Sequence, residues 1–147
     1  MLVANVAGRA VEASIAQASS QFACEPEFVR SQARQCGVQS SYDDPQQLGV
    51  DRWVALIAAR RLHAGSCLVV NAGTALTVDA LTDEGVFLGG IIVPGIELMR
   101  RALDAHTAGL RLQSGAVHFF PANTGDAIMS GAAHAAAGAI ERMARFM

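Results

Sequence analysis

The sequence has few cysteines, few aromatic residues and few charges, and these shortages exclude several classes of protein. Its three cysteines are odd in number and none has CxxC spacing, so neither a disulfide framework nor a zinc site is expected. Charged residues make up 16% of the 147-residue chain and the formal net charge is −2, which argues against a nucleic-acid partner or an acidic membrane surface. No apolar run reaches the roughly 18 residues of a membrane span.

The N-terminal segment also lacks the basic stretch and long apolar core of a signal peptide. We therefore expect a cytoplasmic protein with reduced thiols. Hydrophobic residues make up 52% of the chain, which excludes a disordered polypeptide and suits a buried sheet with helices against it. The length fits one ordinary domain or parts of two, so the composition predicts an α/β fold.

The most informative stretch is residues 67–95, which predict three consecutive strands. A β-branched apolar run at 67–70 enters a turn at 71–73, and a polar cluster at 82–85 separates residues 74–80 from the apolar residues 86–93. The first turn places Gly73 beside the hydroxyl groups of Thr74 and Thr77. Such a turn suits a phosphate, because glycine lets the backbone approach closely, but it is also ordinary turn chemistry.

The flanking segments predict strands and helices in alternation. Expected strands cover residues 2–6 and 27–30 with a fragment at Val38, and expected helices cover 9–20, 51–64, 94–105 and a last helix capped by Asn123 or Thr124. Pro45 suits the first turn of a short helix. In the last helix Gly131, Ala135 and Gly138 share one stripe, which predicts a close contact with another element.

Asp51, in the segment GVDR at 49–52, is the best catalytic candidate. A carboxylate at a helix start is kept ionised by the free backbone N–H groups and the helix dipole, and it then accepts a proton from a substrate hydroxyl. The alternative is a helix-capping aspartate beside a solvated arginine. Four histidines have no i,i+4 pairing and are interpreted as surface or packed residues: His63, His106, His118 and His134.

Several motifs together resemble the type III pantothenate kinases. Residues 71–79, NAGTALTVD, resemble the family's phosphate motif DxGTAxTxD, and GVDR resembles its GxDR motif. Asn123 and Thr124 resemble the Asn-Thr motif, and Gly89, Gly90, Pro94 and Gly95 match a segment GGxIxPG whose glycines allow close backbone approach. The resemblance covers nearly the whole chain. It implies an ATP-dependent transferase that converts pantothenate to 4′-phosphopantothenate, the first step of coenzyme A biosynthesis.

The resemblance also implies the site residues. Asp51 corresponds to the proton acceptor from the primary alcohol, and Thr74 with Gly73 corresponds to the contact with the ATP phosphate. The substrate-binding residues implied by the family are the following: Tyr42, Gly49, Val50, Asp51, Arg52 and Thr124. Phosphoryl transfer needs mainly in-line placement and neutralised charge, so these residue types suit the reaction.

The family fold is that of the acetate and sugar kinase, Hsp70 and actin superfamily, with two ribonuclease-H-like halves. The resemblance assigns residues 1–64 to the C-terminal part of the first half and residues 65–147 to the N-terminal part of the second. The family's opening phosphate loop is absent, so we expect a mixed sheet with flanking helices that is incomplete at both ends. The family further implies a homodimer.

Asn71 departs from the family, which has an aspartate there that helps bind a monovalent cation, potassium or ammonium. Asparagine keeps a side-chain oxygen but loses the negative charge, so weaker binding of the monovalent cation is expected. Magnesium is expected to accompany the nucleotide. Asn71 and the missing loop favour an alternative, an accessory or regulatory relative that binds a ligand or partner without turnover. An unrelated sugar kinase or ATPase of the same superfold is a third interpretation.

Overall fold

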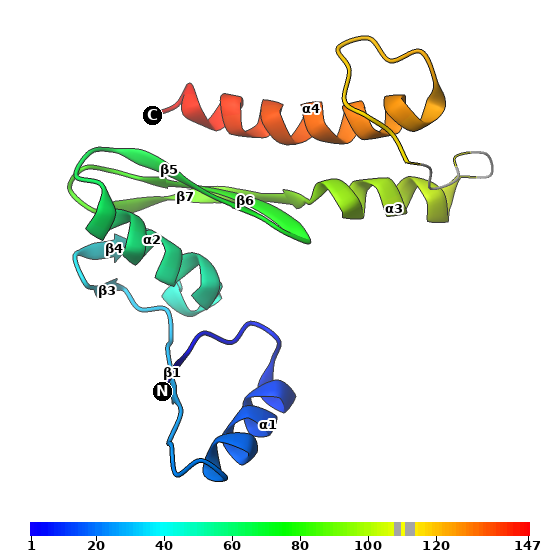
Figure 1. The fold of residues 1–147 in the computed structure, drawn as a ribbon. Coiled ribbons are helices and arrows are strands. Elements are labelled where there is room, and N and C mark those ends of the chain that lie inside the picture. Colours follow the sequence, from blue (N-terminus) through cyan, green and yellow to red (C-terminus); the bar gives the residue numbers. More distant parts are fainter. Residues whose placement is uncertain (108–109, 111–113) are drawn as a thin grey trace. The chain divides into compact units, whose positions relative to one another are not determined.

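The computed structural model describes residues 1–107, 110 and 114–147 and shows mixed α/β structure (Figure 1). Five strands form one mixed sheet in the order β3-β4-β7-β6-β5, and β1 pairs separately with β2. The chain forms two compact units, one of Met1–Cys67 with Leu81–Gly89 and the other of Leu68–Ala80 with Gly90–Met147. Over the described residues, no helix combines the length and apolar character required to cross a membrane.

The first unit begins with a strand, a helix and a second strand. β1 (Leu2–Val3) and β2 (Glu27–Phe28) are parallel, and α1 (Arg9–Ser20) connects them. Glu12, in the first turn of α1, forms an ion pair of 2.6 Å with Arg30 just after β2. The helix predicted at residues 9–20 is confirmed, whereas both strands are shorter than the sequence suggested.

A hairpin and a helix complete the first unit. β3 (Arg34–Gln35) pairs antiparallel with β4 (Val38–Ser40), and β4 lies parallel to β7. The single-turn helix η1 (Pro45–Gln47) and the helix α2 (Val50–Leu62) follow, as the sequence predicted. The unit's core consists of fully buried side chains from α2, β4 and β7: Val38, Trp53, Leu56 and Phe87.

The polar segment 31–37 was not expected to hold a strand, yet β3 lies within it. The strand forms through its backbone pairing with β4 and through Gln35, whose Oε1 accepts a 3.0 Å hydrogen bond from the indole N–H of Trp53. A tertiary partner thus stabilises two residues whose polar side chains carry no strand signal.

The predicted meander is confirmed as β5 (Cys67–Ala72), β6 (Ala75–Leu81) and β7 (Val86–Pro94). Tight turns join these neighbouring strands, so they run antiparallel. Residues 76–81 of β6 are all buried, and β6 lies between β5 and β7 in the sheet. β7 continues through Pro94, and α3 (Ile96–His106) starts two residues later than predicted because Gly95 is still extended.

The second unit ends with α3 and α4 (Thr124–Ala144), which contact each other (Figure 1). Asn123 caps α4, since its side-chain oxygen accepts a 2.9 Å hydrogen bond from the Asp126 amide. The close contact predicted for the small-residue stripe is wrong for Gly131 and Gly138. A Cβ added at either position meets no described atom within 4 Å, so no described element packs closely against these two glycines.

Candidate functional site

Asp51 is the second residue of α2 and is exposed at the helix start. Its Oδ1 accepts a 2.9 Å hydrogen bond from the Arg52 amide, so the carboxylate folds back over the free N–H groups of the first turn. Gly49, the N-cap, makes room for it: a Cβ on Gly49 would lie 2.6 Å from this same oxygen. The geometry holds an acceptor at the positive end of a helix dipole, open to solvent.

Arg52 and Tyr42, both predicted to bind substrate, contact each other within the first unit. The Arg52 residue is only 5% exposed, and its Nη1 donates a 3.3 Å hydrogen bond to the Tyr42 hydroxyl oxygen. Tyr42 is half-buried in the segment between β4 and η1, and Val50, the first residue of α2, is buried. Ten residues separate the tyrosine from the arginine, so no local spacing signalled this contact.

Phe87 of β7 completes this cluster and was not identified from the sequence. Its ring centroid lies 5.4 Å from that of Tyr42, at an interplanar angle of 40°, and 5.9 Å from the guanidinium carbon of Arg52. An apolar residue in a predicted strand gives no sign that it faces a charged group. The only available signal was the general preference of arginine for aromatic faces.

The turn between β5 and β6 presents Thr74. Residues 71–75 are exposed, and the Gly73 amide donates a 3.0 Å hydrogen bond to the Ala75 carbonyl, so that amide serves the turn itself. Thr77 is buried and its Oγ1 accepts a 3.5 Å hydrogen bond from the side-chain amide of Asn71. The turn therefore offers the Thr74 side chain, rather than Thr77, to a ligand.

Gly95 packs directly against this turn. Its amide donates a 2.8 Å hydrogen bond to the Thr74 carbonyl, and a Cβ built on it would lie 2.0 Å from the Gly73 carbonyl oxygen and 2.8 Å from that of Thr74. The predicted close backbone approach is confirmed at this glycine. Only a residue without a side chain fits between α3 and the turn.

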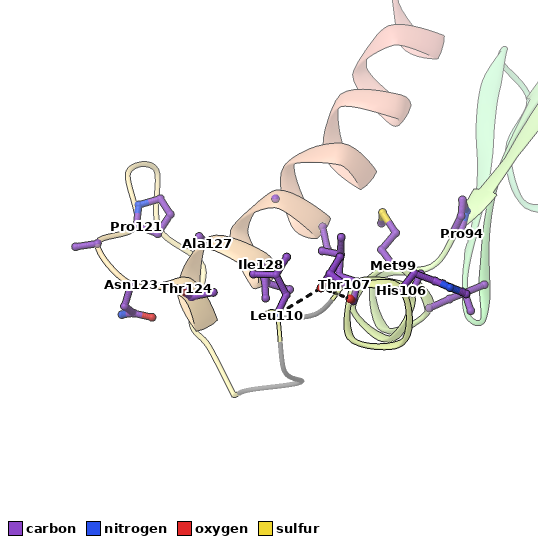
Figure 2. Close-up of a pocket in the computed structure, with 16 residues that line it drawn as sticks. Pro94, Met99, His106, Thr107, Leu110, Pro121, Asn123, Thr124, Ala127 and Ile128 are labelled. Atoms are coloured by element: carbon purple, nitrogen blue, oxygen red, sulfur yellow. Dashed lines mark hydrogen bonds between the residues drawn. The ribbon is translucent and has the colours of Figure 1, made fainter.

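Thr124 begins α4 without capping it and is exposed. It lines an apolar groove of about 1070 Å³ between α3 and α4, together with Met99, Ala127 and Ile128 (Figure 2). Neither Gly73 nor Thr74 is among the described residues that line this groove. Thr124 thus adjoins a largely apolar surface rather than the turn.

The loop before α4 is fixed to the start of the helix by Asp126. The carboxylate accepts hydrogen bonds from the Ala116 amide at 2.8 Å and the Asn123 side-chain amide at 2.7 Å, and His118 Nε2 lies 3.5 Å away. The pKa of Asp126 is held below its ordinary value. The hydrogen bond from the Ala116 amide has the largest effect, followed by the hydrogen bond from Asn123 and the electrostatic attraction of His118. Ser130 Oγ accepts from the His118 amide at 3.0 Å, so the loop has a second attachment.

The predicted residues fall into two groups. Tyr42, Gly49, Val50, Asp51 and Arg52 belong to the first unit, in which the structure joins Tyr42 to Arg52 and Gly49 to Asp51. The second unit contains Asn71, Gly73, Thr74 and Thr124. Over the part of the chain that the structure describes, no three His, Cys, Asp or Glu side chains gather to hold a metal ion.

Known proteins resemble this chain over most of its length. A sequence model described as Type III pantothenate kinase matches residues 1–145. Type III pantothenate kinases of Aromatoleum aromaticum and Nitrosospira multiformis are 55% identical over 141 residues and 47% identical over 147 residues, and one from an Azoarcus species is 52% identical over 143. The alignments cover 96%, 100% and 97% of this chain.

The same alignments cover 58%, 56% and 54% of those relatives, so the chain spans a little over half their length. Among solved structures, a conserved Baf family protein from Campylobacter jejuni superimposes with a TM-score of 0.61 over 96% of this chain and 62% of that one. At 21% identity this likeness concerns the fold. Sequence motifs, family match and relatives agree, and the chain belongs to the type III pantothenate kinase family.

Proposed function

We propose that the chain carries the pantothenate and ATP contacts of a type III pantothenate kinase. In this reaction the primary hydroxyl oxygen of pantothenate bonds to the γ-phosphorus of ATP, the bond from that phosphorus to the bridging oxygen breaks, and ADP leaves. The observation that carries the proposal is the contact of Arg52 with Tyr42, immediately after Asp51 in α2. Family membership supports it.

Asp51 is the proposed general base. Its carboxylate accepts the proton of the substrate hydroxyl, as its exposure and its place at the N-terminus of α2 allow. Gly49 supports this role because it leaves space for the carboxylate, and Val50 anchors the helix start by burial. Arg52, Tyr42 and Thr124 contact pantothenate, with the buried guanidinium supplying positive charge for an anionic substrate.

Thr74 is the proposed nucleotide contact, with its hydroxyl donating to a phosphate oxygen. Gly73 contributes by keeping the turn open, since its amide is already bonded to Ala75. At Asn71 the side-chain amide nitrogen donates to Thr77 Oγ1, so the residue offers a cation its neutral amide oxygen, which suits at most weak binding of potassium or ammonium. Magnesium enters with the nucleotide as its counterion.

The whole protein is proposed to have two ribonuclease-H-like halves, with residues 1–64 in the first and 65–147 in the second. We further propose a cytoplasmic homodimer. The exposed phenylalanines Phe119 and Phe120, at 88% and 96%, support self-association because large apolar surface favours burial.

The test measures pantothenate binding by calorimetry and phosphoryl transfer from ATP, using the chain and its Asp51→Asn variant. The unmodified chain is expected to bind pantothenate, and Asp51→Asn is expected to lower turnover by about 10²–10⁴-fold while binding changes little, because the amide cannot accept the proton. Asp43→Asn, an exposed aspartate one residue beyond Tyr42, is the matched control. Normal turnover in Asp51→Asn would contradict the assignment of the base.

A further inference from the structure

Phe87 is held in place in two ways, by burial of its side chain and by pairing of its backbone with β4. Its side chain is fully buried in the first unit. Along the backbone, Ser40 is its register partner in β4, and the Phe87 carbonyl accepts a 3.1 Å hydrogen bond from the Ser41 amide. The strand therefore holds Phe87 beside the segment that leads directly into Tyr42.

The same ring contacts two polar side chains that also contact each other. It lies 5.4 Å from the Tyr42 ring and 5.9 Å from the Arg52 guanidinium carbon, while Arg52 Nη1 donates to the Tyr42 hydroxyl at 3.3 Å. The three side chains thus form a closed triangle of contacts built from β7, the segment between β4 and η1, and α2.

This arrangement restricts an otherwise flexible side chain. An arginine has many rotamers, and a guanidinium taken out of water is stabilised when it faces the negative π-surface of an aromatic ring. An aliphatic residue at position 87 fills space but has no such surface. Arg52 then loses one of the contacts that order it, and the additional ordering required when substrate binds weakens binding.

We propose that Phe87 is a positioning residue for pantothenate, acting through Arg52 and Tyr42 and not by touching the substrate. The inference rests on the proposed function, because it takes those two residues as the pantothenate contacts. It identifies an aromatic side chain of β7 as part of what sets substrate affinity.

The first experiment compares pantothenate affinity of the chain with that of Phe87→Leu by calorimetry. The expected result is a dissociation constant about tenfold higher, in line with the strength of a desolvated cation–π contact. Leu81→Ala, a variant of another fully buried residue of the first unit, is the matched control and is expected to lower stability without this loss of affinity. An equal loss of affinity in both variants overturns the inference, because it indicates a general packing effect.

A double variant tests whether Phe87 acts through the arginine. In an Arg52→Lys background, where the planar guanidinium is already lost, Phe87→Leu is expected to change the dissociation constant by less than about twofold. A full tenfold effect in that background contradicts action through Arg52.

The second experiment does not depend on substrate. The chain has one tyrosine and one tryptophan, so ring-labelled Tyr42 gives an unambiguous NMR signal and Trp53 an internal control. Phe87→Leu is expected to shift and broaden the Tyr42 ring signal, while the Trp53 indole signal, bonded to Gln35, stays in place. An unmoved Tyr42 signal overturns the positioning role. Absence of pantothenate binding in the unmodified chain instead counts against the proposed function.

Discussion

At the scale of single residues, Gly95 determines how the Thr74 turn can lie. Its amide holds the Thr74 carbonyl and its missing side chain leaves room for the Gly73 carbonyl. Gly95 has no side chain, and adding one would force the Thr74 turn to move.

Gly95→Ala is therefore expected to lower the free energy of unfolding by about 1–3 kcal/mol and to weaken ATP binding, because the new Cβ forces the turn to move. Denaturant unfolding and nucleotide titration measure the two effects. Gly138→Ala, where an added Cβ meets no described atom within 4 Å, is the control. Unchanged stability in Gly95→Ala would show that the turn shifts freely.

Asn123 and Thr124 are neighbours to which we assign different roles. Asn123→Ala is expected to destabilise the chain by about 1 kcal/mol, because it removes the acceptor for the Asp126 amide at the start of α4. Thr124→Ala is expected to leave stability nearly unchanged and to weaken pantothenate binding, since its hydroxyl is exposed at the groove. Thermal unfolding and calorimetry on both variants separate the cap from the site. The reverse pattern would assign the cap to Thr124.

Individual residues were predictable where the chemistry is local. Asp51 at a helix start and the close approach at Gly95 follow from short motifs. The Phe87 contacts do not, because they join a strand to a bend and a helix more than thirty residues earlier, and pairing across that distance depends on the sheet order. The proposed roles of Thr74 and Asn71 remain predictions.

At the scale of elements, the attachment of the pre-helix loop to α4 depends on an ionised Asp126. The folded-state pKa is lowered, so the carboxylate stabilises the attached loop at pH values above the ordinary aspartate pKa. That contribution is lost as pH falls below about 4, through the folded-state value.

We expect the protection of the Ala116 amide against hydrogen exchange, relative to its intrinsic rate at each pH, to fall, and its NMR signal to move, as pH falls through this range. Protonation weakens the acceptor that holds this amide at 2.8 Å. In Asp126→Asn the neutral side chain does not titrate, so the pH dependence should disappear, whereas Asp43→Asn should keep it. An Ala116 signal that still titrates in Asp126→Asn would show that a group other than Asp126 causes the change.

Two glycines of α4 that no described residue contacts closely lead to a prediction of increased stability. Gly131→Ala and Gly138→Ala are each expected to raise the free energy of unfolding by roughly 0.5–1 kcal/mol, because alanine favours a helix interior and an added Cβ meets nothing nearby. Denaturant unfolding at low protein concentration measures this. Destabilisation that grows with protein concentration would reveal a partner packed against the stripe.

Helices were the easiest elements to predict because their spacing is local. Residues 9–20 follow from Val11 and Ile15 on one face, whereas β3 is two polar residues whose strand exists through its pairing with β4. The close contact predicted for the small-residue stripe of α4 is not made at Gly131 or Gly138 by any described residue, because sequence shows which side chains are small but not how closely another element approaches them.

At the scale of the whole molecule, several large apolar side chains remain exposed. In the second unit Phe119 and Phe120 are 88% and 96% exposed, on a loop that Asp126 and Ser130 hold against α4. Two adjacent phenylalanines on a fixed loop lose little conformational entropy when they are covered, so they favour association. The proposed homodimer has a candidate contact here.

Sedimentation of the chain is thus expected to show a species larger than the 15.3 kDa monomer at micromolar concentration. Replacing both rings, as Phe119→Ser with Phe120→Ser, should shift the equilibrium toward monomer by at least tenfold, since burying each ring contributes about 1.5–3 kcal/mol. Phe22→Ser, which removes a 79% exposed ring just after α1, is the control and should have a smaller effect. If the two changes act equally, association follows general apolar exposure and the loop has no special place in the dimer.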